Sequence, residues 1–212
     1  MRIAADVQAY SVTVILLFVL ELACPLLFSQ ENGSNAPENP IVAWQDMRAE
    51  EQYDHAASLY SKRKYTQAAV AFNAACNHLN AKACSNLGFM YTSGVGVKRN
   101  YKLAAELYRR GCEGGNSVGC SNLGVMYWQG KLPKDDERAV ELFEKACNGA
   151  ETGGCLALGF MYENGQGVRQ DTTQAAALYR KACNLRNEQG CVQLSLLKPQ
   201  TEEADATPVM AK

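Results

Sequence analysis

Eight of the nine cysteines in this 212-residue chain form four pairs with one spacing, Cys-x7-Cys. The first cysteines of successive pairs lie 36, 35 and 36 residues apart. The pairs are Cys76 and Cys84, Cys112 and Cys120, Cys147 and Cys155, and Cys183 and Cys191. A repeat of this length is typical of solenoids, in which each unit packs mainly against its neighbours. The spacing therefore predicts stacked units rather than one globular core, with the cysteines as structural partners in every unit.

A second pattern follows the second cysteine of the first three pairs. The shared motif is Cys-x2-Leu-Gly-x-Met-Tyr-x2-Gly, and it begins at Cys84, Cys120 and Cys155. After a loop comes another run in which Leu and aromatic residues recur three and four positions apart, which is helix periodicity. Each unit is therefore predicted to be two antiparallel helices. The first helix should end at the motif's last glycine, because glycine commonly terminates helices: Gly94, Gly130 and Gly165.

The solenoid is expected to cover residues 46–197, with an atypical first unit and a short last helix. Irregular terminal units are needed because they must face water. Residues 1–29 contain a ten-residue, mainly apolar stretch from Ser11 to Leu20, which suits a signal peptide better than a membrane span, although an N-terminal anchor is an alternative. Residues 30–45 are predicted to be a linker, and the polar stretch 198–212 a disordered tail.

The ninth cysteine, Cys24, lies inside the signal-like segment. Whether it is removed with that segment or carries a lipid, eight cysteines remain in the mature domain. An even number of regularly paired cysteines in an exported chain predicts a disulfide framework, and hence a secreted or periplasmic location. A tetrathiolate metal site would need two pairs to converge, whereas successive pairs should be offset by about a helix-packing distance of 8–10 Å. We therefore expect neither a metal nor another cofactor.

Charge excludes another class of partner. The formal net charge is -1, and no basic cluster is longer than Lys62-Arg63-Lys64. A nucleic-acid-binding domain would be expected to carry a broader basic surface. We therefore predict no nucleic-acid partner, and no membrane contact beyond a possible N-terminal anchor.

The paired helices and the LGxMYxxG motif resemble Sel1-like repeats, which are relatives of tetratricopeptide repeats. With a Cys-x7-Cys pair in each unit, the chain is similar to the secreted cysteine-rich proteins first described in Helicobacter. The resemblance covers residues 47–197. It implies an all-α, right-handed α/α superhelical solenoid in which each cysteine pair is a disulfide between neighbouring helices. It also implies two kinds of function: interaction with host proteins, and weak β-lactamase or penicillin-binding activity.

The motif helix has two faces that are expected to differ. Its methionines should pack in the core between units, beside glycines at which the neighbouring helix comes close: Met90, Met126 and Met161, with Gly88, Gly124 and Gly159. The opposite face carries a mixed row that does not resemble core. In related solenoids the first helices line a concave groove, which suits an extended protein or peptide ligand. The candidate groove residues are Asn86, Phe89, Asn122, Val125, Trp128, Gln129, Phe160 and Asn164.

Two alternatives stay open for this row. It is equally compatible with an ordinary solvated helix face, and Trp128 could be an exposed anchor or could fill a gap. The second alternative is an enzyme that binds a β-lactam or a peptidoglycan-like peptide. The Ser-x-x-Lys tetrapeptide occurs at Ser61 and Ser195, but the Ser-Asp-Asn and Lys-Thr-Gly motifs of serine β-lactamases do not occur. With only two histidines, His55 and His78, a zinc site is not indicated either, and the catalytic residues stay unknown.

Overall fold

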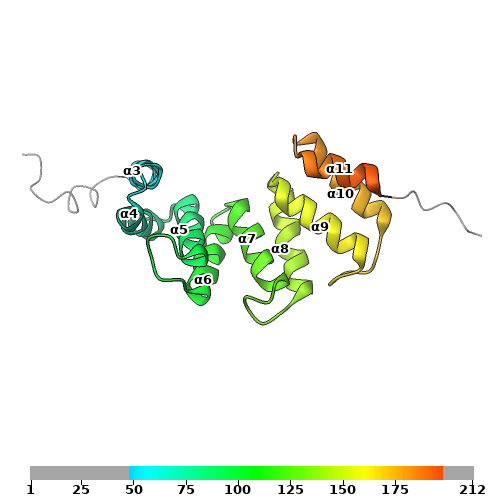
Figure 1. Ribbon diagram of the computed structural model, residues 1–212, viewed down its shortest axis with the longest axis horizontal. Helices are drawn as coiled ribbons and strands as arrows, with labels where there is room; N and C mark the ends of the chain where they lie inside the picture. Colours follow the sequence, from blue (N-terminus) through cyan, green and yellow to red (C-terminus); the bar gives the residue numbers. More distant parts are fainter. Residues whose placement is uncertain (1–47, 198–212) are drawn as a thin grey trace, which may run out of the picture. The chain divides into compact units, whose positions relative to one another are not determined.

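The computed structural model describes residues 48–197, and every regular element within this range is an α-helix (Figure 1). The predicted all-α repeat fold is therefore confirmed. The predictions for residues 1–29, 30–45 and 198–212 lie outside the described residues. The helices are α3 (Ala49–Ser61), α4 (Tyr65–Asn77), α5 (Ala81–Ser93), α6 (Tyr101–Glu113), α7 (Ser117–Trp128), α8 (Asp136–Asn148), α9 (Thr152–Asn164), α10 (Thr172–Asn184) and α11 (Glu188–Leu196).

The helices stack in chain order, each packing against the one before and the one after. We call α3, α5, α7, α9 and α11 the first helices, and α4, α6, α8 and α10 the second helices. Helix α5 also contacts α7, and α7 contacts α9, so first helices of successive units touch directly. A ligand lying along the stack would therefore meet one first helix after another.

Side-chain caps at the helix starts explain why these segments form helices. Asn80, Asn116, Glu151 and Asn187 precede first helices, and each accepts a hydrogen bond from backbone N–H groups of the first turn. Asn100, Asp135 and Asp171 cap three second helices in the same way. Each cap satisfies a backbone donor that the helix itself leaves unpaired.

The predicted helix ends are confirmed for α5 and α9, whereas α7 ends at Trp128, before Gly130. Gly94 and Gly165 terminate α5 and α9 in the left-handed conformation, with φ of 76° and 65°. In α7 the C-cap is Gln129, and Gly130 follows it with φ of 68°. Glycine adopts this conformation without the steric cost that a Cβ would add.

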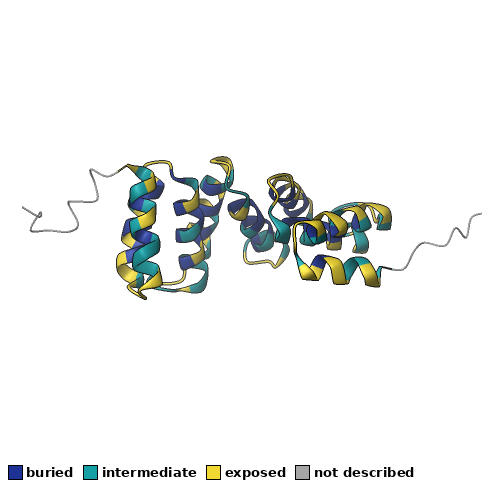
Figure 2. Ribbon diagram, turned by 90° about the horizontal axis from the view of Figure 1, so that it is seen from above, coloured by how far each residue is buried: buried dark blue, intermediate teal, exposed yellow. Residues whose placement is uncertain are grey.

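The core lies between the helices of each pair and between neighbouring pairs (Figure 2). The motif methionines Met90, Met126 and Met161 are at most 2% exposed, so the predicted core face is confirmed. The motif leucines, which precede the methionines by three residues, are buried beside them: Leu87, Leu123 and Leu158.

The motif glycines are the expected points of close approach. A Cβ on Gly88 would lie 2.9 Å from the ring of Tyr108, and one on Gly124 would lie 2.8 Å from Phe143. In the third unit a Cβ on Gly159 would lie 2.6 Å from the ring of Tyr179. Glycine thus leaves space for an aromatic ring of the second helix in each unit.

The four cysteine pairs are disulfides in the structure, joined as the resemblance implies. Each links the C-terminal part of a second helix to the start of the next first helix, with Cα–Cα distances of 4.7, 4.5, 4.5 and 4.6 Å. Within residues 48–197 no group of His, Cys, Asp and Glu side chains could hold a metal ion. The cysteines therefore act as covalent links between successive repeats.

Candidate ligand-binding surface

The candidate groove residues come from three first helices. We call Asn86, Phe89, Asn122, Val125, Trp128, Gln129, Phe160 and Asn164 the first-helix row. Apolar members occupy the fifth position after the second cysteine of each unit. Phe89 is 48% exposed and Phe160 is 38% exposed. Val125 is half-buried and packs against a core cluster formed by α8 and α9. The structure thus leaves an apolar side chain partly open to solvent on successive first helices.

The structure brings Asn86 and Phe89 together at a cavity of about 310 Å³. We call it the N-terminal cavity. Its other lining residues are Ala57, Tyr60 and Ser61 of α3 and Phe72 of α4. The side-chain amide of Asn86 lies 3.5 Å from the hydroxyl of Tyr53, at the margin of hydrogen-bonding distance. The cavity therefore has a mostly apolar lining and an amide that can still donate and accept.

The indole of Trp128 fills space between units. Its Nε1 donates a hydrogen bond to Oε1 of Gln166, at 3.0 Å. Its ring lies 5.5 Å from that of Phe160 and 6.5 Å from that of Phe143, between centroids. Trp128 is half-buried, so it supports Phe160 of the next first helix from one side.

The polar members of the row differ in their hydrogen bonds and in their exposure to solvent. Asn164 donates from its amide to the backbone carbonyl of Phe160 at 2.8 Å, while Gln129 caps the end of α7 and is exposed. Asn122 is half-buried on α7 at the position that corresponds to Asn86. The structure therefore brings Trp128 and Phe160 into contact, and places Asn86 and Asn122 at equivalent positions of successive units.

The sequence did not point to the residues that the two terminal helices of the solenoid, α3 and α11, add to the candidate surface. Ala57 and Tyr60 line the N-terminal cavity, but they belong to the atypical first unit, which lacks the motif. At the other end, the fifth position after Cys191 is Leu196, which is 67% exposed on α11. Continuing the count from the last cysteine would have found Leu196, whereas nothing in the local sequence pointed to Ala57.

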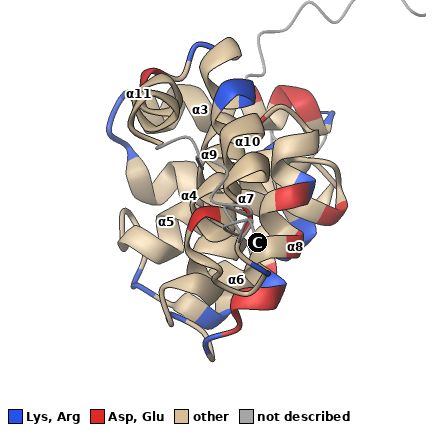
Figure 3. Cartoon of the chain, turned by 90° about the vertical axis from the view of Figure 1, so that its right-hand side faces the viewer, with Lys and Arg blue, Asp and Glu red and all other residues tan. Residues whose placement is uncertain are grey.

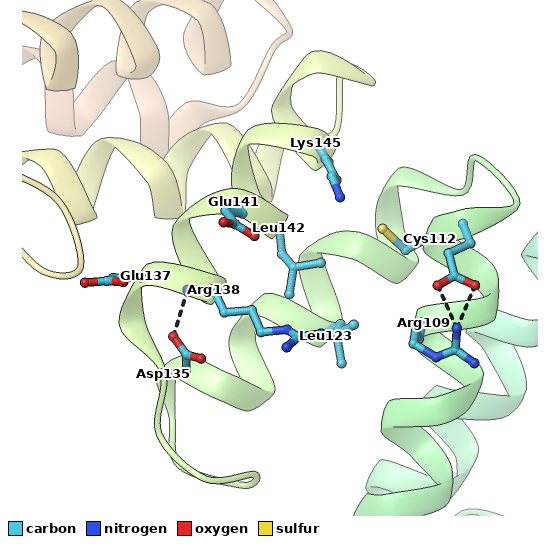
Figure 4. Close-up of a pocket in the computed structure, with 10 residues that line it drawn as sticks. Arg109, Cys112, Leu123, Asp135, Glu137, Arg138, Glu141, Leu142 and Lys145 are labelled. Carbon is cyan, nitrogen blue, oxygen red and sulfur yellow. Dashed lines mark hydrogen bonds and ion pairs between the residues drawn. The ribbon is translucent and has the colours of Figure 1, made fainter.

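A second depression of about 310 Å³ lies between α6 and α8 (Figure 4). Figure 4 shows Arg109 of α6 and Lys145 of α8 on opposite sides of it. Arg109 is held by Glu106 and Glu113, at 2.6 Å from each carboxylate. Charges of both signs line the depression, which is typical of a solvated helix surface.

The two Ser-x-x-Lys tetrapeptides do not form a catalytic arrangement. Ser61 is the last residue of α3, and its hydroxyl donates to the carbonyl of Ser58 at 2.9 Å. The chain leaves the helix before Lys64, through Arg63 at a φ of 59°. Ser195 donates to its own helix, to the carbonyl of Val192. Both hydroxyls are exposed and bonded to backbone carbonyls, and neither has a base as a hydrogen-bond partner.

No helix within the described range is both long enough and apolar enough to cross a bilayer. The family model described as "Sel1 repeat" matches residues 81–116, 117–150 and 153–187. The chain belongs to the Sel1 repeat family. Proteins of this family are typically scaffolds for protein–protein interaction.

Solved structures agree with this assignment. A Sel1 repeat protein from Oxalobacter formigenes shares 25% identity and a TM-score of 0.64, over 69% of this chain and 61% of its own. A protective antigen of uropathogenic Escherichia coli with an SLR fold shares 26% identity and a TM-score of 0.65, over 70% of this chain and 33% of its own. The chain therefore spans less than two thirds of either protein.

A third solved structure is that of a cysteine-rich protein. Helicobacter pylori cysteine rich protein B is 32% identical, and the match covers 59% of this chain and 96% of that protein, with a TM-score of 0.49. A comparison with curated proteins finds no match.

Proposed function

We propose that the first-helix row is a docking surface for an extended segment of a partner protein. The observation that carries this proposal is the repetition of exposed apolar side chains. Phe89, Phe160 and Leu196 occupy one position of three different units, and they are 48%, 38% and 67% exposed. An ordinary solvated face would be expected to carry polar or charged side chains at such positions. Side chains spaced along the stack suit a ligand that lies across several repeats.

The side-chain amides of the row could form hydrogen bonds with the backbone of such a ligand. An extended peptide has unpaired backbone N–H and C=O groups that must keep hydrogen-bond partners when they leave water. A side-chain amide can donate and accept at once, and Asn86 and Asn122 place one in each of two successive units. The apolar side chains would then accept side chains of the ligand, while the amides bind its backbone.

The same proposal includes a location outside the cytoplasm. Four disulfides in a chain of this size are typical of proteins that fold in an oxidising compartment. The partner would then be an exported or cell-surface protein. No contact in the structure favours the alternative ligand, a β-lactam, over a peptide.

The test uses peptides selected from a displayed random library on the oxidised protein. A selected peptide carrying a fluorophore is titrated with the wild type and with Phe89→Ser and Phe160→Ser. Each substitution should weaken binding by about tenfold or more, because removing a large apolar anchor costs about 1–2 kcal/mol or more.

The matched control is Val70→Ser, because Val70 is 50% exposed on the second helix α4. It should leave binding unchanged, and circular dichroism should show that all the variants stay folded. Equal binding by the wild type and a Phe89→Ser/Phe160→Ser double variant would overturn the proposal.

A further inference from the structure

The N-terminal cavity lies in a part of the chain with an unusual charge distribution. Residues 55–105 contain seven Lys and Arg residues and no Asp or Glu. The chain as a whole has 21 basic and 22 acidic residues, so the imbalance is local. In Figure 3 the ribbon of α5 accordingly carries no red. The surface around this cavity therefore differs electrostatically from the rest of the molecule.

Two loops that approach Tyr60 and Tyr65 carry exposed cationic side chains. Ser61 lines the cavity, and Lys62, Arg63 and Lys64 follow it directly in the loop before α4. The loop after α5 carries Lys98 and Arg99. We call these five residues the cationic rim. All five are exposed, and none forms an ion pair with another described residue.

Packing holds the two loops together. The rings of Tyr60 and Tyr65, on either side of the first loop, are 5.1 Å apart in an edge-on arrangement. The second loop approaches the same point, since a Cβ on Gly96 would lie 2.5 Å from the backbone of Tyr65. Tyr60 is also a wall of the cavity. Tyr60 and Ser61 line the cavity and directly precede the first loop of the rim, so the rim and the cavity are neighbours.

From this arrangement we infer that the N-terminal cavity selects peptide segments in which an apolar side chain is flanked by carboxylates. The apolar side chain would enter between Tyr60, Phe72 and Phe89, and the carboxylates would lie over the cationic rim. This inference rests on the proposed function, and it adds the chemistry of the partner at this end of the row. Unpaired exposed cations attract carboxylates without first breaking an existing ion pair, so the rim is free to contribute.

The cavity favours a peptide over a nucleic acid as the bound partner. A nucleic acid would use the rim for its phosphates, but it would gain little from an apolar cavity of side-chain size. Binding of nucleic acid would therefore depend on the rim and not on Phe89. Binding of an acidic peptide should depend on both.

The experiment compares three fluorescein-labelled peptides with one Leu-Phe core and acidic, amide or basic flanks. Their sequences are Glu-Asp-Leu-Phe-Glu-Asp, Gln-Asn-Leu-Phe-Gln-Asn and Lys-Arg-Leu-Phe-Lys-Arg. The oxidised full chain should bind the acidic peptide about tenfold more tightly than the amide peptide at low salt. This ratio should fall towards one at about 0.5 M NaCl, where the Debye length is only a few ångströms.

Two triple variants provide the matched comparison. Lys62→Gln/Arg63→Gln/Lys64→Gln should abolish the preference for the acidic peptide. Arg180→Gln/Lys181→Gln/Arg186→Gln should keep it, because these exposed cations lie on and after α10, and Arg186 shares the positive φ of Arg63. Phe89→Ser should weaken binding of both the acidic and the amide peptide.

Each outcome separates the two proposals. If the amide peptide binds as tightly as the acidic one and Phe89→Ser weakens both, the inference is wrong and the docking surface stands. If none of the three peptides binds, both are wrong for this cavity. If a labelled single-stranded oligonucleotide binds in a rim-dependent way while the peptides do not, the rim is a nucleic-acid contact and the inference is wrong.

Discussion

At one position of the repeat, the residue type varies with the aromatic side chain that it contacts. The eighth residue after the second cysteine meets the aromatic residue that packs on the motif glycine. The hydroxyl of Tyr108 lies 3.2 Å from Thr92, and that of Tyr179 donates to Glu163 at 2.6 Å. In the middle unit the partner ring is Phe143, which has no hydroxyl, and the position holds Trp128 in edge contact. Polar partners thus occur with tyrosine and an apolar partner occurs with phenylalanine.

The motif glycine gives a prediction about packing. In Gly124→Ala the new methyl group would press on the buried ring of Phe143. We expect the free energy of unfolding in urea to fall by about 1–3 kcal/mol, although alanine is the better helix former. Asn73→Ala, at an exposed position of α4, should cost nothing. Equal stability of Gly124→Ala and the wild type would show that the ring has room to move.

The two buried tyrosines give a prediction about pH. Burial raises the pKa of Tyr108, and burial together with the Glu163 carboxylate raises the pKa of Tyr179. The folded state therefore favours the neutral phenols, so this stabilisation is complete below the ordinary tyrosine pKa of about 10 and is lost as the pH rises above it. The free energy of unfolding should fall above about pH 10 less steeply in Tyr108→Phe/Tyr179→Phe than in the wild type. Parallel pH profiles would contradict the assignment.

At the scale of elements, the helices were largely predictable from the sequence. The cysteine spacing fixes the repeat length, and several helix ends follow from local chemistry: Asn or Asp caps the start of six helices, and glycine follows the end of α5, α6, α8 and α9. The short last helix that the sequence predicts is α11, from Glu188 to Leu196. Local patterns are sufficient for α5 to α11, because each of these helices starts at a side-chain cap next to it in the chain.

The candidate site was less predictable, because its contacts cross between units. Trp128 meets Gln166, which follows it by 38 residues in a loop with no motif of its own. The N-terminal cavity depends on Tyr60 and Ala57, which lie in the one pair of helices that departs from the repeat. Spacing along the chain identifies equivalent positions, whereas the neighbours of each position depend on packing.

The disulfides yield a prediction at the same scale. Cys191 is exposed and Cys183 is half-buried, whereas the cysteines of the first and third pairs are at most 2% exposed. A soluble reductant should therefore open Cys183–Cys191 before the buried pairs. Partial reduction, alkylation and peptide mass spectrometry would give the order. Earlier labelling of Cys76 or Cys147 would contradict the burial that we describe.

At the scale of the whole molecule, the surfaces of the first helices and of α6 and α8 differ in character. The second helices α6 and α8 carry charged side chains of both signs, which line the depression between them. The first helices carry the repeated apolar and amide positions, and at the N-terminal cavity they meet the cationic rim. The disulfides link each unit to the next, which keeps equivalent positions of successive first helices in register for a ligand that crosses several of them.

Hydrogen exchange with a bound peptide tests this division most directly. The oxidised protein is measured alone and with a library-selected peptide, and deuterium uptake is compared helix by helix. The account predicts that the peptide slows exchange in α5, α7 and α9 and in the loops at their C-terminal ends, and leaves the exposed faces of α6 and α8 unchanged. Protection concentrated on α6 and α8 would contradict it, and would place the binding surface on the second helices.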